Sequence, residues 1–182
     1  MWKFFTAALT LTCTYSLHAQ SVSESLLAGN WYVIRWQTSD RLLDFEDSAA
    51  SVRFMIDNFK QKNKVPAVPK DDSLRMSQEL HKVMSAAEGL RFRLNFNKDK
   101  SFIWSTGTDN TAQYKGTYSL SANNSEIVLT SFDGLTKAYR TMALKLDALQ
   151  ANQMTIEIPS EEPGIKQSKF TLRRESAVGN RQ

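Results

Sequence analysis

From residue 90 onward, hydrophobic and polar positions alternate with a period of two, which is typical of strands with one buried face. Seven such segments follow one another, separated by turns rich in Gly, Asn, Asp and Pro, with hydrophobic positions spanning residues 92–96, 102–104, 114–120, 127–129, 142–146, 154–158 and 170–172. An eighth segment, residues 30–38, comes earlier. Eight short strands predict a mainly-β fold, an antiparallel up-and-down barrel wide enough for one small ligand, with a two-sheet sandwich as the alternative.

The segment between residues 45 and 88 has a helical period instead. Hydrophobic residues recur there at steps of three and four, which places them on one helix face. They are Phe45, Ala49, Val52, Ile56 and Phe59, and then Met76, Leu80, Val83 and Ala87. Residues 64–69 separate the two runs, because the prolines among them cannot sit inside a helix. The pattern predicts a two-helix insert between strands 1 and 2, expected to cover the open end of the barrel.

The first nineteen residues have the layout of a secretory signal peptide. Lys3 lies before an apolar run of about ten residues, and a more polar segment ends at Ala19. That run is well short of the roughly 20 residues that cross a bilayer. We therefore predict a protein that does not span a membrane and is exported, to the periplasm or outside the cell. Residues 20–182 would form one domain without the chain's only cysteine, Cys13.

Composition and motifs argue against several function classes. The formal charge is +4, and the basic residues are scattered rather than clustered, so we predict no nucleic-acid partner. The sequence has no nucleophile elbow, no phosphate-binding loop and no cluster of His, Asp and Glu at metal-ligand spacing. His81, the only histidine after the signal segment, falls on a polar helix face. We therefore predict no enzyme, no cofactor and no metal.

The two ends of the predicted barrel carry a family resemblance. Gly29-Asn30-Trp31 opens the first strand, and Arg174 ends the last strand on the same face as Phe170 and Leu172. The chain therefore resembles the lipocalin-like (calycin) β-barrel domains of exported bacterial proteins. In that family the Trp lies across the closed end of the barrel, and an Arg of the last strand packs on it. The resemblance implies barrel closure by Gly29, Trp31 and Arg174.

Two arginines fall on inward positions when the strands are counted by twos, Arg35 from Trp31 and Arg140 from Met142. A buried guanidinium is unfavourable unless it is paired. Either the two form internal ion pairs or lie at the barrel mouth, or they bind a ligand carboxylate, which suits the forked geometry of arginine. In the second case the ligand site would also contain Tyr114, Tyr118, Phe92, Phe102, Trp104 and Met142.

The resemblance implies a function in binding rather than catalysis. The predicted ligand is small and hydrophobic, and it is anionic and fatty-acid-like if the two arginines bind it. The alternative is a protein-interaction module whose barrel is filled by side chains and whose partner is another protein.

Overall fold

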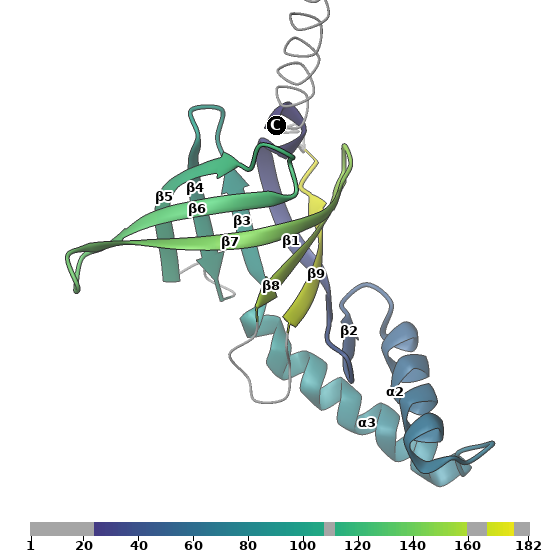
Figure 1. Cartoon of the computed structure of the whole chain (residues 1–182). Coiled ribbons are helices and arrows are strands. Elements are labelled where there is room, and N and C mark those ends of the chain that lie inside the picture. Colours follow the sequence, from purple (N-terminus) through teal and green to yellow (C-terminus); the bar gives the residue numbers. More distant parts are fainter. Residues whose placement is uncertain (1–23, 108–111, 160–166, 177–182) are drawn as a thin grey trace, which may run out of the picture.

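A computed structural model of the chain describes residues 24–107, 112–159 and 167–176 (Figure 1). The predicted signal peptide, residues 1–19, lies outside these ranges. Among the described residues, no helix is both long enough and apolar enough to cross a membrane.

Eight antiparallel strands form a closed barrel in the order of the sequence. They are β1 (Gly29–Gln37), β3 (Phe92–Phe96), β4 (Ser101–Thr106), β5 (Ala112–Leu120), β6 (Glu126–Asp133), β7 (Ala138–Leu149), β8 (Gln153–Pro159) and β9 (Gln167–Arg174). Each strand pairs with the next, and β1 pairs with both β3 and β9, which closes the ring. The predicted up-and-down barrel is confirmed, and the pairing of β1 with β9 excludes the two-sheet sandwich.

One end of the barrel is closed by Trp31. Its side chain is fully buried, its Nε1 donates to the Leu27 carbonyl oxygen at 2.7 Å, and the Arg174 guanidinium carbon lies 4.6 Å from its ring centroid. Arg174 also donates to the Leu26 carbonyl oxygen. The Arg174 side chain packs 3.4 Å from where a Cβ of Gly29 would stand, at a φ of +144° that favours glycine. The structure thus brings the three predicted closure residues together.

The buried side chains of the inner faces form the main core. Besides Trp31 they include Leu94, Phe96, Ile127, Leu144, Met154, Ile156 and Leu172, all less than 2% exposed. Because successive strand residues point to opposite faces, each strand contributes every second residue to this core. Partly buried side chains, Trp104 and Phe170 among them, pack against this core.

A short strand that the sequence pattern missed, β2 (Leu42–Asp44), pairs with the end of β1. A tight turn joins them, in which Thr38 donates its N–H to the Arg41 carbonyl oxygen at 2.9 Å. On the other side, the pairing of β1 with β9 shifts by one residue between Val33 and Arg35. Such a β-bulge exchanges the two faces of a strand. Trp36 therefore points inward and stacks on Phe170, and Arg35 points outward.

The helical insert has two helices, α2 (Ser48–Asn63) and α3 (Lys70–Ala87), as predicted. They follow β2, pack on it and on each other, and bury Leu43, Leu80 and Ala87 in a second, smaller core. Figure 1 shows both helices extending away from the barrel beyond the ends of β8 and β9. The prediction that the helices form a lid over the open end is wrong. The short strand β2 extends the sheet, and its Leu43 packs against Leu80 and Ala87 of α3.

Asp44 joins the insert to the barrel. Its Oδ2 accepts hydrogen bonds from Nε and Nη2 of Arg35 at 2.8 and 2.5 Å, and its Oδ1 accepts the N–H groups of Glu46 and Asp47. Its own N–H donates to Ser51 Oγ at 2.8 Å. Burial raises the pKa of Asp44, but the hydrogen bonds from Arg35, Asp47 and Glu46 outweigh that effect and hold it below its ordinary value.

We expect Asp44→Asn to lower the free energy of unfolding by about 1–3 kcal/mol at neutral pH, because charged hydrogen bonds are lost in a buried site. A carboxyl whose pKa is lowered on folding adds stability above its unfolded pKa, about 3.9, and loses it as pH falls through the folded pKa. The gap between wild type and variant should therefore shrink below about pH 4. Urea unfolding across this pH range measures it.

Asp57→Asn is the matched control, since Asp57 forms an exposed pair with Lys60 on α2. A constant loss at all pH values for Asp44→Asn, or an equal loss for Asp57→Asn, would contradict the role of Asp44.

Candidate functional site

A groove opens at the end of the barrel opposite Trp31. It has a volume of about 380 Å³ and is formed by β4, β5, β6 and β7. We call it the mouth groove; its lining residues are Phe102, Trp104, Tyr114, Leu129, Ser131, Arg140, Thr141 and Met142. Phe102 and Leu129 are buried and form the floor, whereas Tyr114 and Met142 are exposed at the rim. Neither α2 nor α3 contributes a lining residue.

Strand register explains why these side chains meet. β1 starts at the closed end, so in an antiparallel meander β5 and β7 start at the open end. Trp104 of β4 lies opposite Tyr114 of β5. Ser131 of β6 lies opposite Arg140 of β7. Directly opposed residues of antiparallel strands share a face, and this face is the inner one because it continues that of the core.

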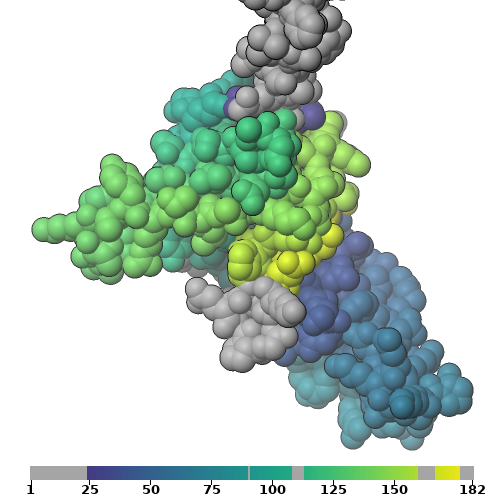
Figure 2. All heavy atoms as spheres, in the orientation of Figure 1, coloured from purple at the N-terminus to yellow at the C-terminus, as the bar shows by residue number. Residues whose placement is uncertain are grey.

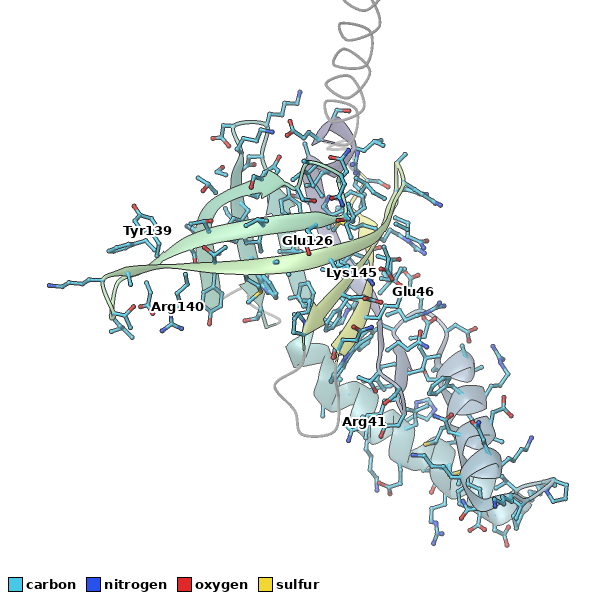
Figure 3. The ribbon with its side chains drawn as sticks, in the orientation of Figure 1. Arg41, Glu46, Glu126, Tyr139, Arg140 and Lys145 are labelled. Atoms are coloured by element: carbon cyan, nitrogen blue, oxygen red, sulfur yellow. The ribbon has the colours of Figure 1, made fainter. Side chains whose placement is uncertain are left out.

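An ion pair lies at the rim of the mouth groove. Arg140 Nη2 is 2.7 Å from Asp133 Oδ2 across the β6–β7 hairpin. Hydrogen bonds from the backbone N–H groups of Leu135 and Thr136 hold the pKa of Asp133 below its usual range, and Arg140 lowers it further. Asp133 therefore stays ionised and keeps Arg140 at the rim. Figure 3 shows Arg140 and Tyr139 near the projecting end of β7.

Aromatic rings support the wall of the mouth groove. The Trp104 ring packs against Phe92 with centroids 4.8 Å apart, and Phe92 meets Phe170 edge to face at 5.0 Å. Nε1 of Trp104 is buried and has no acceptor among the described residues. Leaving such a donor unsatisfied is unfavourable by about 1–3 kcal/mol. The wall is thus built from packed aromatic rings and contains one buried N–H donor without an acceptor among the described residues.

The structure brings five of the predicted ligand residues into one groove: Phe102, Trp104, Tyr114, Arg140 and Met142. Phe92 stands behind them, buried against Trp104 rather than exposed in the groove. Alternation along four strands therefore predicted most of one continuous surface.

The predicted inward position of Arg35 is wrong, because its side chain does not point into the barrel. The bulge in β1 turns it outward, where its side chain is 47% exposed and pairs with Asp44. The idea of two uncompensated arginines inside the barrel is therefore wrong, since Arg140 also has a carboxylate partner. Of the two arginines, Arg140 alone lines the mouth groove, where it could bind an anion.

Tyr118 shares the face of Tyr114 but lies deeper in the barrel. Its hydroxyl donates to the Asn97 carbonyl oxygen at 3.0 Å in the turn between β3 and β4, near the closed end. Burial raises the pKa of the Tyr118 phenol, and the carboxylates of Glu24 and Asp99 add to this. The predicted place of Tyr118 in the ligand site is therefore wrong, because its hydroxyl is bound to Asn97 and Tyr118 is not among the lining residues of the mouth groove. Four residues along a strand correspond to roughly 13 Å.

Sequence reasoning missed three lining residues of the mouth groove: Leu129, Ser131 and Thr141. Counting by twos from Ile127 through Leu129 reaches Ser131, so its inward direction was available in the alternation. Ser131 was missed because the inner face was identified by its hydrophobic residues, and serine is polar. Thr141 had no such signal, because it alternates with Arg140 and Met142.

The described residues contain no group of three or more His, Cys, Asp or Glu side chains that could hold a metal ion. His81 is exposed on α3. The lining of the mouth groove combines apolar surface with one arginine, Arg140, and three hydroxyl-bearing residues, Tyr114, Ser131 and Thr141. The carboxylate of Asp133 pairs with Arg140 beside the groove. This donor set suits the binding of an amphipathic molecule.

A closed eight-stranded meander with an arginine packed on a tryptophan at one end is the fold that the resemblance to lipocalin-like barrels implied. Comparison of solved structures finds a lipocalin-like protein from Bacteroides uniformis, with 16% identity over 82% of this chain and 99% of that chain, at a TM-score of 0.41. An uncharacterized protein from Bacteroides eggerthii matches with 13% identity over 81% of this chain and 98% of that chain, at a TM-score of 0.39. No protein-family model and no curated protein matches the chain.

Proposed function

We propose that this protein binds one small hydrophobic molecule with an anionic head group in the mouth groove, without catalysing a reaction on it. The observation that carries the proposal is an apolar groove floored by Phe102 and Leu129 with the Arg140 guanidinium at its rim. Its volume of about 380 Å³ falls in the range of small-molecule sites. The sequence pattern of residues 1–19 supports export as the setting of this binding.

Arg140 supplies the head-group site. A guanidinium has five N–H donors in a fork that fits a carboxylate, so one carboxylate partner does not exhaust it. Asp133 holds the side chain in place through the contact of 2.7 Å. The attraction for an anion is moderate, because Asp133 offsets part of the charge and the Arg140 side chain is 68% exposed.

The tail of the ligand would lie on the aromatic wall. Trp104 and Met142 both line the groove, together with the buried Phe102. A flexible Met adapts to an alkyl chain, and a rigid Trp supplies a large contact area. Burial of the chain supplies most of the affinity, at about 25 cal/mol per Å² of apolar surface.

We expect a medium-chain fatty acid to bind with a change in tryptophan fluorescence and its methyl ester to bind about tenfold more weakly, one charged hydrogen bond being lost. Arg140→Gln should weaken binding of the acid by a similar factor and abolish the difference between acid and ester. Titration of each protein with both compounds measures these affinities.

Arg93→Gln is the matched control, because Arg93 lies on the outer face of β3 and pairs with Glu175. It should leave both affinities unchanged. Equal affinities of acid and ester in the wild type would remove the anionic head group from the proposal, and absence of binding by either would remove the ligand.

The second candidate function is a protein-interaction module. The surface that a protein partner would have to cover is formed by Phe132, Leu135 and Tyr139, which are exposed on the β6–β7 hairpin. This alternative requires a barrel filled by side chains, whereas the mouth groove leaves a space of about 380 Å³.

A further inference from the structure

The hairpin between β6 and β7 projects from the barrel as an arm, drawn in green in Figure 2. Three large hydrophobic side chains are exposed at its end: Phe132, Leu135 and Tyr139. Leu135, in the turn itself, is 96% exposed. We call residues 132–139 the hairpin tip. Leaving these side chains in water is unfavourable, so a surface that covers them would be bound.

The hairpin tip has a defined shape. Phe132 lies opposite Tyr139 in the ladder, and their rings meet edge to face with centroids 5.4 Å apart. Asp133 Oδ1 accepts the N–H groups of Leu135 at 2.9 Å and of Thr136 at 3.3 Å, which holds the turn. The apolar side chains are thus presented in advance of any contact, and little ordering is needed when a partner covers them.

Basic side chains accompany the apolar ones. Lys137 in the turn and Arg140 just after it are exposed. Asp133 is the single acidic residue of the segment from residue 132 to residue 140, so the segment carries a net positive charge. Apolar side chains beside Lys and Arg match the boundary between the acyl chains and the head groups of an anionic membrane.

The size of the hairpin tip decides between a lipid surface and a protein. A stable protein–protein interface buries about 800 Å² on each partner, contributed by roughly 20 residues or more. A convex turn with three large side chains is far smaller than that. A bilayer instead deforms around a projecting turn and takes up each apolar side chain individually.

We propose that the hairpin tip docks on an anionic lipid surface, with Leu135 and Phe132 inserted among the acyl chains and Lys137 at the head groups. The proposal goes beyond the ligand groove and does not rest on it, since Phe132 and Tyr139 lie on the outer face of the hairpin. Arg140 and Met142, on the inner face, line the mouth groove. Docking therefore brings the mouth of the barrel to the membrane surface.

The test places a reporter at the tip. Leu135→Trp, mixed with vesicles of equal parts phosphatidylcholine and phosphatidylglycerol, should show a blue shift of tryptophan emission and quenching by brominated acyl chains. Leu74→Trp is the matched control, because Leu74 is 60% exposed on α3, away from the hairpin. It should show neither effect. Pure phosphatidylcholine vesicles and high salt should both weaken the signal of Leu135→Trp, since screening removes the attraction of Lys137.

A second experiment removes the apolar side chains. Phe132→Ser combined with Leu135→Ser should weaken vesicle co-sedimentation at least about tenfold, while Leu74→Ser should leave it unchanged. Vesicle binding unchanged in the double variant, or no quenching of Leu135→Trp, would overturn the proposal. A dimer that forms without lipid and is lost in the double variant, as measured by sedimentation, would also overturn the proposal, since a second copy of the chain would then cover the hairpin tip. The vesicle experiments contain no fatty acid, so a negative result in them does not bear on the fatty-acid titration that tests the mouth groove.

Discussion

Replacing Trp31 with alanine is expected to lower the free energy of unfolding by about 3–5 kcal/mol, the usual range for a large aromatic side chain removed from a core. Trp31 is fully buried and plugs the closed end of the barrel. Its loss also leaves the Leu27 carbonyl oxygen without the Nε1 donor and the Arg174 guanidinium without its ring. Urea unfolding followed by far-ultraviolet circular dichroism measures the loss.

Arg174→Ala should lower the same free energy by about 1–3 kcal/mol, through lost contact with the Trp31 ring and the lost hydrogen bond to Leu26. Arg173→Ala is the matched control from the next position in β9. Arg173 faces solvent and pairs with Glu46, so its replacement should change stability by no more than about 0.5 kcal/mol. Similar losses at both positions would show that closure does not depend on the inner arginine.

Gly116→Ala is expected to lower the free energy of unfolding by about 3 kcal/mol, the upper part of the range for overpacking. A methyl group at this position would lie 1.9 Å from the Thr130 carbonyl oxygen of the neighbouring strand β6. The contact is with backbone, so no side chain can rotate to relieve it. The strands β5 and β6 would have to separate locally, which amide hydrogen exchange of Thr130 and Ser131 would report alongside the urea midpoint.

Gly134→Ala provides the comparison, because nothing lies within 4 Å of the position that its methyl group would take in the β6–β7 turn. It should change stability by no more than about 0.5 kcal/mol. Wild-type stability for Gly116→Ala would mean that β5 and β6 adapt easily, and that the tight approach at Gly116 has little energetic importance.

The strands of this protein could be predicted from the sequence because strand alternation is a local property. Phe92 to Phe96 and Met154 to Ile158 show it within five residues, and turn residues between such segments mark their ends. Alternation also placed Arg174 on the inner face, and so beside Trp31, once the first and last strands were taken as neighbours. The mouth groove followed in part, since Phe102, Trp104 and Met142 each continue an inner face.

The remaining features depend on partners distant in the chain, and only the tertiary structure decided them. The register of β1 against β9 shifts by one residue between Val33 and Arg35. Arg35 therefore points away from the barrel interior and pairs with Asp44. Alternation assigns a face but no depth, so Tyr118 was expected in the groove and lies at the closed end. The apolar faces of α2 and α3 were expected to pack over the mouth of the barrel. In the structure they pack on β2, a strand that the sequence pattern did not predict. Periodicity records which side of an element is apolar, whereas the surface that meets that side is chosen by packing across the whole chain.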